Sequence, residues 1–537
     1  MMKKRLALSL SSGLLMVLAF PLFALWPLAF IALVPLYFSL DDVSPKRTFL
    51  LGWTAGLFFF TGLLYWIVLN PAVEPWVKPL LYLGVILIAA YLALYLAVGL
   101  ALARWLSNRL GWPLWSLAPS ILVLADYLRS HGLLAFPWGS LGYSLAGWIP
   151  AIQLASFSGI YGATFWVLMV NGLTFWLIQS LRNKSLTNAW SRLIRPAAIL
   201  AVTLSLPLLA GQLFLIQTEK TMEGAPKLKV ALIQGNIEQG LRWDDTFRHY
   251  NWQTYDSLSR RAAADSPQLL VWPETALPFY LRHEPGYLRR IFSLADDVNA
   301  YVLTGVPDLK HDAELDCQAF YNSAFLILPN EGLAASYAKS HLVPFGERFP
   351  YKEKIPFLKE VDFGEGEWTP GADSVIFHTT LTDFSCLICF ESIFPEIART
   401  QVGQGAKFLV NITNDGWFGR SGAARQHADM SVFRAVEQRR AIARCANSGI
   451  SMFVMPTGRV VARTGLFEQA ILQAEVPLIN GSTFYQRHGD IFVLALSLLL
   501  ALAIIAPYCK KLRPKNLNSD YRRSEEHTSE LQSRQVI

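Results

Sequence analysis

The segment FSCLICFESIFPE at 384–396 contains two thiols suited to covalent chemistry, those of Cys386 and Cys389. If 384–389 is a β-strand, a rise of about 3.3 Å per residue separates the two α-carbons by about 10 Å and sends the side chains to opposite faces. A disulfide needs α-carbons closer than about 7 Å, and a zinc site needs further thiols or histidines at similar spacing, which the sequence lacks. We interpret Cys386 as a small buried residue. Cys389, at the junction of strand and turn, is either a nucleophile or a second core residue.

Other segments could supply the partners of a nucleophilic cysteine, which needs a base for its proton and a donor or cation for the oxyanion. Glu274 follows a strand-like run in VWPETALP, between two prolines, and is either that base or a solvated loop residue. Lys339, in YAKSHLVPFGERFP, could hold the oxyanion, and its ammonium would lower the thiol pKa from about 8.5. Glu347 follows in the same segment, and NITNDGWFG adds Asn411, Asn414, Asp415 and Trp417.

The composition of the whole chain indicates a membrane protein. Of its 537 residues, 53% are hydrophobic, and the mean hydropathy is +0.32. The chain is therefore too apolar for an ordinary soluble protein and too long for one compact domain. The net charge of +7 does not indicate a nucleic-acid partner, because the lysines and arginines cluster between apolar runs. The five cysteines are too few and too scattered for a disulfide framework.

Eight apolar runs approach the length of about 20 residues that a membrane-spanning helix needs. We expect seven helices before a long polar insert and one after it, at 6–20, 22–40, 49–69, 79–102, 113–128, 152–181, 196–216 and 491–507. The N-terminal MMKKR and its apolar run resemble a signal peptide, but no small-x-small site follows, so we do not expect cleavage. The basic loops gather on one side, which predicts cytoplasmic termini and an insert outside the cytoplasm.

The insert, 226–489, is predicted to be a soluble α/β domain. The β-rich runs KLKVALIQ, QLLVWPE, AYVLTGV, SAFLILP, SCLICFE, KFLVNIT and ISMFVMP alternate with polar or helix-like stretches such as 431–446. Several runs end in a polar residue, and functional groups gather at strand carboxyl ends in α/β sheets. We therefore divide the chain into a membrane domain (1–222), the insert, a last membrane helix (490–510) and a cytoplasmic tail (511–537). Within the tail, 523–533 resembles a translated sequencing adapter.

Four segments in order, LLVWPETALP, YAKSHLVPFGE, CFESIFPE and NITNDGWFG, behind seven predicted spans, resemble the apolipoprotein N-acyltransferase family. This family is the membrane branch of the nitrilase superfamily, and the resemblance covers about 1–508. It implies an α-β-β-α sandwich with a Glu-Lys-Cys triad, which by motif is Glu274, Lys339 and Cys389. It also implies supporting roles for Glu347, Glu391 and Trp243. One departure is Phe390, where the family often has tyrosine, so any role of that hydroxyl is in doubt.

The resemblance also implies a two-step, ping-pong reaction at the periplasmic face of the bacterial inner membrane. Cys389 would take a fatty acyl chain from a phospholipid as a thioester and pass it to the N-terminal amine of diacylglyceryl-cysteine in an apolipoprotein. Glu274 would act as the base, Lys339 would hold the oxyanion, and neither a metal nor an organic cofactor is implied. Aromatic-rich loops beside the motifs would suit a membrane interface, or would line the core: Phe279, Tyr280, Phe349, Tyr351, Phe357, Leu358, Phe363 and Trp368.

Two other functions compete with this interpretation. The first is a membrane-anchored nitrilase-type amidase whose thioester is resolved by water. The many predicted spans favour a lipid acyl donor, because a soluble amidase would need one anchor at most. The second is a transporter or receptor with an external domain, which is weakened because the apolar runs contain hardly any central charged residues.

Overall fold

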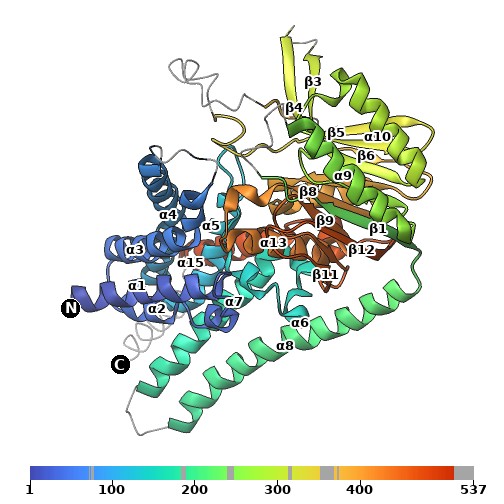
Figure 1. The fold of residues 1–537 in the computed structure, drawn as a ribbon. Helices are drawn as coiled ribbons and strands as arrows, with labels where there is room; N and C mark the ends of the chain where they lie inside the picture. Colours follow the sequence, from blue (N-terminus) through green and yellow to red (C-terminus); the bar gives the residue numbers. More distant parts are fainter. Residues whose placement is uncertain are drawn as a thin grey trace, which may run out of the picture.

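The computed structural model describes residues 1–71, 73, 76, 78–182, 189–238, 247–312, 317–350, 368–371 and 374–512. It places a bundle of apolar helices beside a two-sheet sandwich (Figure 1). Several residues singled out in the sequence lie outside the described ranges: Trp243, Tyr351, Phe357, Leu358, Phe363 and the adapter-like segment 523–533.

The bundle is built from α1 (Met2–Ala19), α3 (Pro45–Leu63), α4 (Lys78–Leu110), α5 (Leu114–Arg129), α7 (Ala155–Arg182), α8 (Ala189–Glu223) and α15 (Ile491–Leu512), with the short α6 (Ile149–Ile152). Within the described ranges, four helices are long and apolar enough to cross a membrane: Pro45–Leu69, Lys78–Leu110, Ala155–Arg182 and Leu193–Glu223. The apolar helices Trp26–Ser39 and Ile491–Ala506 are shorter. Length and composition thus support a multi-helix membrane region, but the eight spans expected from the sequence are not confirmed.

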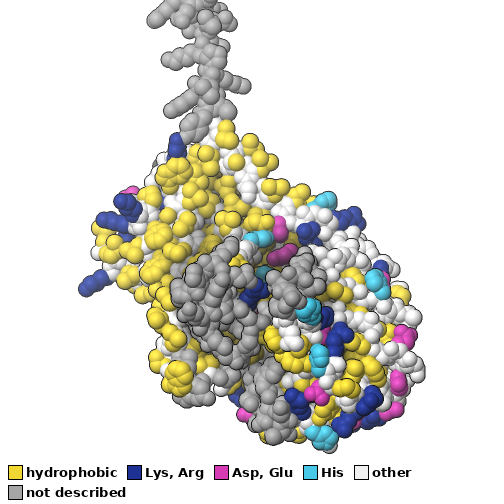
Figure 2. All heavy atoms as spheres, turned by 90° about the horizontal axis from the view of Figure 1, so that it is seen from above, with side chains coloured by type: hydrophobic (Ala, Val, Ile, Leu, Met, Phe, Trp, Pro, Cys, Tyr) yellow, Lys and Arg dark blue, Asp and Glu magenta, His cyan; other side chains and the backbone are white. Residues whose placement is uncertain are grey.

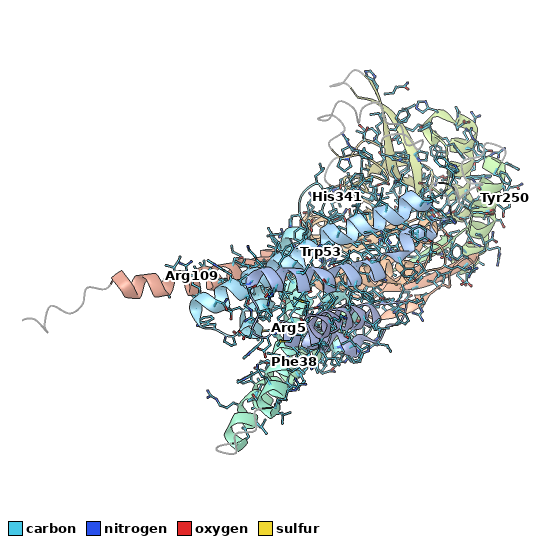
Figure 3. All side chains as sticks on the ribbon, turned by 90° about the vertical axis from the view of Figure 1, so that its left-hand side faces the viewer. Arg5, Phe38, Trp53, Arg109, Tyr250 and His341 are labelled. Carbon is cyan, nitrogen blue, oxygen red and sulfur yellow. The ribbon has the colours of Figure 1, made fainter. Side chains whose placement is uncertain are left out.

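Apolar side chains cover the outside of the bundle. Leu206, Leu209 and Leu213 of α8 and Leu494 and Leu498 of α15 are all exposed. Figure 2 shows hydrophobic side chains gathered over the bundle and charged side chains spread over the sandwich. Figure 3 places Arg109 at the end of the bundle far from the sandwich. An apolar exterior of this extent suits helices that face lipid, because soluble proteins rarely expose large apolar patches.

The expected helix at 22–40 is not one helix. The segment forms a 3-10 turn, η1 (Trp26–Phe30), and α2 (Val34–Ser39), each with a proline in its first turn. A proline lacks the amide N–H that would continue a preceding helix, so it favours a new start. Asn171 of α7 satisfies the backbone at the break: its Oδ1 accepts from Leu33 N and its Nδ2 donates to Ala29 O, both at 2.7 Å.

The insert forms two six-stranded sheets, in the orders β12-β1-β2-β3-β4-β5 and β11-β10-β9-β8-β7-β6. The first contains β1 (Lys227–Gln234), β2 (Leu269–Val271), β3 (Tyr301–Asp312), β4 (Cys317–Leu328), β5 (Gly332–Ala338) and β12 (Ala470–Pro477). The second contains β6 (Ile376–Phe377), β7 (Phe384–Ile388), β8 (Phe408–Thr413), β9 (Ile442–Ala446), β10 (Met452–Val454) and β11 (Val460–Arg463). The runs β1-β2-β3 and β7-β8-β9 are parallel, so the carboxyl ends of their strands meet at one edge of each sheet.

Helices cover both outer faces, which gives the expected α-β-β-α order. The helices α9 (Arg248–Ala262) and α10 (Pro285–Val298) pack on the first sheet, and α12 (Pro395–Gly403) and α13 (Ala423–Gln438) lie on the second, with α14 (Phe484–His488) leading into α15. Val230 of β1 and Val410 of β8 belong to one core between the sheets. Phe433 of α13 and Val167 of α7 belong to one continuous core. The second helix layer is therefore shared by the sandwich and the bundle.

The helix-like stretch expected at 431–446 is instead the end of one helix followed by a strand. Helix α13 ends at Gln438, and Arg439 adopts a left-handed φ of 50° as its C-cap. The chain then enters β9, in which all five residues are buried. Because β9 lies between β8 and β10, backbone pairing and burial on both faces decide its conformation.

Candidate active site

Cys389 lies at a sharp turn between a buried strand and a helical turn. It directly follows β7 and begins the 3-10 helix η8 (Cys389–Ile393), with a left-handed φ of 51°. Its side chain is partly exposed, whereas Cys386 is fully buried between the sheets, and both thiols are free. The burial of Cys386 confirms the sequence interpretation. A non-glycine residue at this φ is uncommon and marks the turn as strained.

Glu274 is held in the loop after β2 by the neighbouring strand and by two hydrogen bonds. Its Oε1 accepts from Asn322 Nδ2 and its Oε2 from the backbone N–H of Asn414, both at 2.8 Å. The loop passes close to β3, where a Cβ on Gly305 would lie 2.6 Å from the Glu274 Cα. The side chain is 5% exposed, so Glu274 is a fixed, buried carboxylate and not a solvated loop residue.

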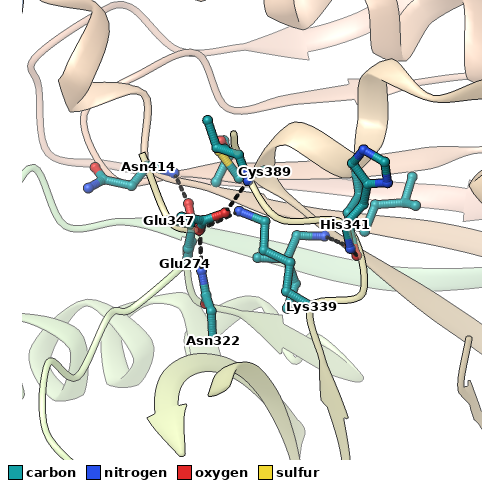
Figure 4. A network of polar contacts seen from close by, with 12 residues as sticks. Glu274, Asn322, Lys339, His341, Glu347, Cys389 and Asn414 are labelled. Carbon is teal, nitrogen blue, oxygen red and sulfur yellow. Dashed lines mark hydrogen bonds and ion pairs between the residues drawn. The ribbon is translucent and has the colours of Figure 1, made fainter. Parts of the chain in front are cut away.

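Lys339 directly follows β5 and is 1% exposed. Its Nζ lies 2.7 Å from Glu347 Oε1 and 3.5 Å from Glu274 Oε1 (Figure 4). The other oxygen of Glu347 accepts from Val343 N at 2.8 Å, which closes the turn that carries this carboxylate. Asn322 Nδ2 also donates to Glu347 Oε1 at 3.2 Å, so one amide links both carboxylates around the ammonium.

The charges of this cluster fix the protonation of lysine and cysteine. Burial alone would lower the pKa of Lys339, but the carboxylates of Glu347 and Glu274 hold it well above its usual range. Burial raises the pKa of the Cys389 thiol, Glu274 raises it further, and Lys339 offsets only part of the increase. The lowered thiol pKa expected from the sequence is therefore wrong. The resting thiol carries its proton at neutral pH and needs a base before it can attack.

Glu391 connects the lysine loop to the cysteine turn. It is fully buried, and its Oε1 accepts from Tyr337 OH at 2.6 Å and from Ser340 N at 2.7 Å. Its Oε2 accepts from Ile388 N at 2.7 Å. Burial raises the pKa of Glu391, although these donors oppose the increase. This carboxylate thus ties the residue before Cys389 to the segment after Lys339.

The remaining sequence candidates lie in a buried network beside the site, in packed aromatic clusters or in partly exposed loops. Asn411 accepts from Arg444, and Asp415 pairs with the same guanidinium at 2.8 Å, so both belong to a buried network beneath the turn. The Phe390 ring is buried against Phe136, with ring centroids 6.2 Å apart. Of the aromatic loop residues, Phe279 lies in the core of the sandwich, whereas Tyr280, Phe349 and Trp368 are partly exposed.

Sequence reasoning missed three residues that hold the site. Asn322 links the two carboxylates, Tyr337 donates to Glu391, and His427 contacts the backbone carbonyl of Cys389 at 3.1 Å. Asn322 had a usable signal, because it is a polar residue in the middle of β4, directly before the run SAFLIL. The other two had none. Among the described residues, no group of three or more His, Cys, Asp or Glu side chains could hold a metal ion.

The arrangement can perform acyl transfer. A partly exposed thiol lies beside a buried carboxylate that can take its proton and a permanent cation that can face an oxyanion (Figure 4). Either water or an amine can attack the resulting thioester and release the acyl chain from the cysteine. Both acceptors fit this geometry.

Comparison with known proteins assigns both parts of the chain. The family model described as apolipoprotein N-acyltransferase N-terminal domain matches 12–173, and the carbon-nitrogen hydrolase model matches 229–482. A Geobacter metallireducens protein named apolipoprotein N-acyltransferase is 39% identical over 90% of this chain and 91% of its own length. A Chlorobaculum tepidum protein of the same name is 32% identical over 95% of this chain and 98% of its own. With the two sheets, the hydrolase match confirms the expected nitrilase-type fold.

Two solved structures resemble the sandwich more distantly. Saccharomyces cerevisiae Nit3, a member of branch 10 of the nitrilase superfamily, has 21% identity and a TM-score of 0.36, over 47% of this chain and 90% of its own. An amidase from Nesterenkonia sp. has 18% identity and a TM-score of 0.37, over 50% of this chain and 95% of its own. At these TM-scores neither structure carries an argument about function.

Proposed function

The chain belongs to the apolipoprotein N-acyltransferase family, and on that premise we propose the reaction of its site. The enzyme transfers a fatty acyl chain from a membrane phospholipid to the N-terminal amine of diacylglyceryl-cysteine in apolipoproteins, with Cys389 as the nucleophile. One observation carries the proposal: the cluster of Glu274, Lys339 and Glu347 lies beside the strained turn at Cys389. The helix layer on this sheet shares a hydrophobic core with the apolar bundle.

In the first half-reaction, Cys389 Sγ attacks the ester carbonyl of the phospholipid while Glu274 takes the thiol proton. The negative charge that develops on the carbonyl oxygen faces the Lys339 ammonium. The ester C–O bond then breaks, and Glu274 returns the proton to the departing alkoxide. A lysophospholipid leaves, and the acyl chain remains on Cys389 as a thioester. Since the thiol is protonated at rest, this step depends on the base.

In the second half-reaction, the lipoprotein amine attacks the thioester carbon. Glu274 takes a proton from the attacking nitrogen, and Lys339 again faces the oxyanion. The C–S bond breaks, and the proton moves to the thiolate, which restores Cys389. An ester and an amine thus become an alcohol and an amide, so no oxidant or reductant is needed. Glu347 holds Lys339 in place, and Glu391 holds the turn on which Cys389 lies.

The site is proposed to work at the periplasmic face of the bacterial inner membrane. The asymmetry of the basic loops supports this orientation. The core shared by α13 and the bundle supports a site close to the lipid surface, where both substrates are anchored. His341 lies where the sandwich meets the bundle, and its ring is 4.0 Å from that of Phe394 (Figure 3).

The experiment that tests this function follows the first half-reaction. Purified enzyme is incubated with phospholipid, and the peptides that contain Cys386 and Cys389 are examined by mass spectrometry. Wild type and Cys386→Ala are expected to gain a fatty acyl mass on the Cys389 peptide and to release lysophospholipid, whereas Cys389→Ala gains none. An adduct that required Cys386, or lysophospholipid release without Cys389, would remove Cys389 as the nucleophile.

A further inference from the structure

The turn at Cys389 is strained and needs external support. A left-handed φ on a residue with a Cβ costs about 1–3 kcal/mol and persists only where the surroundings over-determine it. On the upstream side, Glu391 accepts the N–H of Ile388 at 2.7 Å. On the downstream side, the carbonyl of Cys389 needs donors, because the turn directs it into the protein interior.

Two buried side chains meet that carbonyl. Ser392 Oγ donates to the Cys389 carbonyl at 2.9 Å, and His427 Nε2 lies 3.1 Å from the same oxygen. Ser392 Oγ and His427 Nε2 are also 3.0 Å apart, so the three groups form a closed triangle. Ser392 is fully buried and His427 is 1% exposed, so water cannot replace either donor.

The far side of the imidazole is anchored in a buried ionic network. His427 Nδ1 lies 3.0 Å from Arg444 Nη2 and 3.1 Å from Asp415 Oδ1. Arg444 and Asp415 pair at 2.8 Å, and Thr413 Oγ1 donates to Asp415 at 3.0 Å. At Nδ1 the Arg444 guanidinium can only donate and the Asp415 carboxylate can only accept, so this side does not set the tautomer. At Nε2 the Cys389 carbonyl can only accept, which requires the proton on Nε2. Burial and then Arg444 lower the pKa of His427, which agrees with a neutral ring that carries a single proton.

The bundle fixes the orientation of this ring. His427 lies on α13, where neighbouring Gln426 accepts from Trp138 Nε1 at 2.7 Å and donates to Pro21 O at 2.5 Å. The Trp138 ring packs 5.8 Å from the imidazole at 31°, and Phe418 lies against its edge at 5.7 Å and 88°. The histidine is thus held by the apolar helices on one side and by the sandwich network on the other.

We propose that His427 is a positioning residue for the nucleophile: its Nε2–H donates to the Cys389 carbonyl and keeps the turn in its left-handed conformation. This inference rests on the proposed function of Cys389. His427 touches no reacting atom and acts only through the backbone that carries the thiol. If the carbonyl is released, the turn relaxes and Sγ moves relative to Glu274 and Lys339. A displacement of about 1 Å at a reacting atom costs about 10²-fold in rate.

Two amide substitutions separate this role from a general structural one. The amide nitrogen of glutamine reaches the position of Nε2, whereas that of asparagine reaches only the position of Nδ1. His427→Gln is therefore expected to keep thioester formation within about threefold of wild type, and His427→Asn and His427→Leu to slow it by about tenfold or more. In both slow variants the concentration of phospholipid giving half-maximal rate should remain unchanged, because the lipid contacts are not altered.

A matched control on the same helix accounts for stability. Val436 is fully buried on α13 and lies away from the turn, so Val436→Ala is expected to lower the thermal midpoint without slowing thioester formation. Equal slowing in His427→Gln and His427→Asn, or slowing in Val436→Ala that matches its loss of stability, would overturn the positioning role.

A second measurement keeps this inference separate from the function of the enzyme. The rate at which iodoacetamide alkylates Cys389 needs no lipid and reports the same thiol geometry. It should be near wild type in His427→Gln and reduced in His427→Asn. If wild type formed no acyl adduct, the proposed function would be wrong, while the alkylation rates would still confirm or refute the role of His427. Equal alkylation in the two amide variants would refute it.

Discussion

Replacement of Lys339 by methionine tests how the buried charges of the site depend on one another. The substitution keeps most of the side-chain volume and removes the ammonium that lies 2.7 Å from Glu347 and 3.5 Å from Glu274. We expect two losses at once. The oxyanion loses its cation, and the buried carboxylates of Glu274 and Glu347 lose the positive charge that lies between them.

The size of the second loss follows from the spacing of the carboxylates. Glu274 Oε1 and Glu347 Oε1 accept from the same Asn322 Nδ2, at 2.8 and 3.2 Å. Two carboxylates about 5 Å apart repel by about 3 kcal/mol at an effective dielectric constant of about 20. Burial of unpaired charge adds to this cost, so Glu274 is expected to serve less well as the base. Loss of a base costs about 10²–10⁴ in rate and loss of an oxyanion partner about 10²–10³, so thioester formation in Lys339→Met should fall by at least about 10³.

A second substitution should return part of that activity. Adding Glu347→Gln removes one carboxylate and with it the repulsion on Glu274, while the oxyanion still lacks its cation. The double variant is therefore expected to form the thioester at least about tenfold faster than Lys339→Met, although far more slowly than wild type. The assay is the rate of acyl adduct formation on the Cys389 peptide, measured by mass spectrometry, with the thermal midpoint as a folding control.

Two results would refute this reasoning. Near-normal adduct formation in Lys339→Met would remove the lysine from the mechanism. A double variant no faster than Lys339→Met, at equal thermal midpoint, would show that repulsion between the two carboxylates does not limit the base.

Three further predictions concern stability, pH and topology. Glu391→Gln should lower the free energy of unfolding by at least about 2 kcal/mol and slow thioester formation, because an amide cannot accept all the donors around this carboxylate; an unchanged thermal midpoint would contradict this. Burial and Lys339 lower the pKa of His341 from 6.5 to about 4. Below pH about 6.5 the unfolded chain therefore takes up a proton that the folded chain does not, and the fold loses stability as the pH falls towards 4. The thermal midpoint of wild type should thus fall more between pH 7 and 5 than that of His341→Phe, and parallel curves would contradict this. A reporter active only outside the cytoplasm should be active when fused after Gly224 and silent after Lys511; the reverse result would invert the proposed orientation.

The proposed catalytic residues Glu274 and Cys389 could be predicted because each follows a strand that is legible in the sequence, whereas Lys339 follows β5, which is not among the expected runs and was identified by its motif alone. Strand β1 has the bounds of the run KLKVALIQ, β7 begins one residue before the run SCLICFE, and β8 lies within the run KFLVNIT. Strands β7 and β8 pair in parallel, so the carboxyl ends of their runs lie together. The alternation of strands with helical segments in the sequence indicates this parallel pairing. The motifs supplied the identity of the residues at those ends.

The supporting contacts could not be predicted, because they depend on residues distant in sequence. Asn322 reaches Glu274 across 48 positions, and His427 reaches the Cys389 carbonyl across 38. The break at 22–40 is likewise held by Asn171, 138 positions from Leu33. Apolar periodicity reports which side chains are buried but not which partner satisfies a buried backbone group. The expected pKa of the thiol was wrong for the same reason, since burial of Cys389 and its distance from Glu274 are properties of the fold.

The fate of the acyl chain on Cys389 tests the central claim most directly, because it separates an acyltransferase from a hydrolase with the same cluster. Wild-type protein purified from membranes is loaded with phospholipid, and the adduct on the Cys389 peptide is followed after addition of a diacylated lipopeptide. A lipopeptide with a free N-terminal amine should clear the adduct and gain the acyl mass, whereas the N-acetylated lipopeptide should leave the adduct in place. Loss of the adduct in buffer as fast without lipopeptide as with it would show that water is the acceptor and would contradict the proposed function.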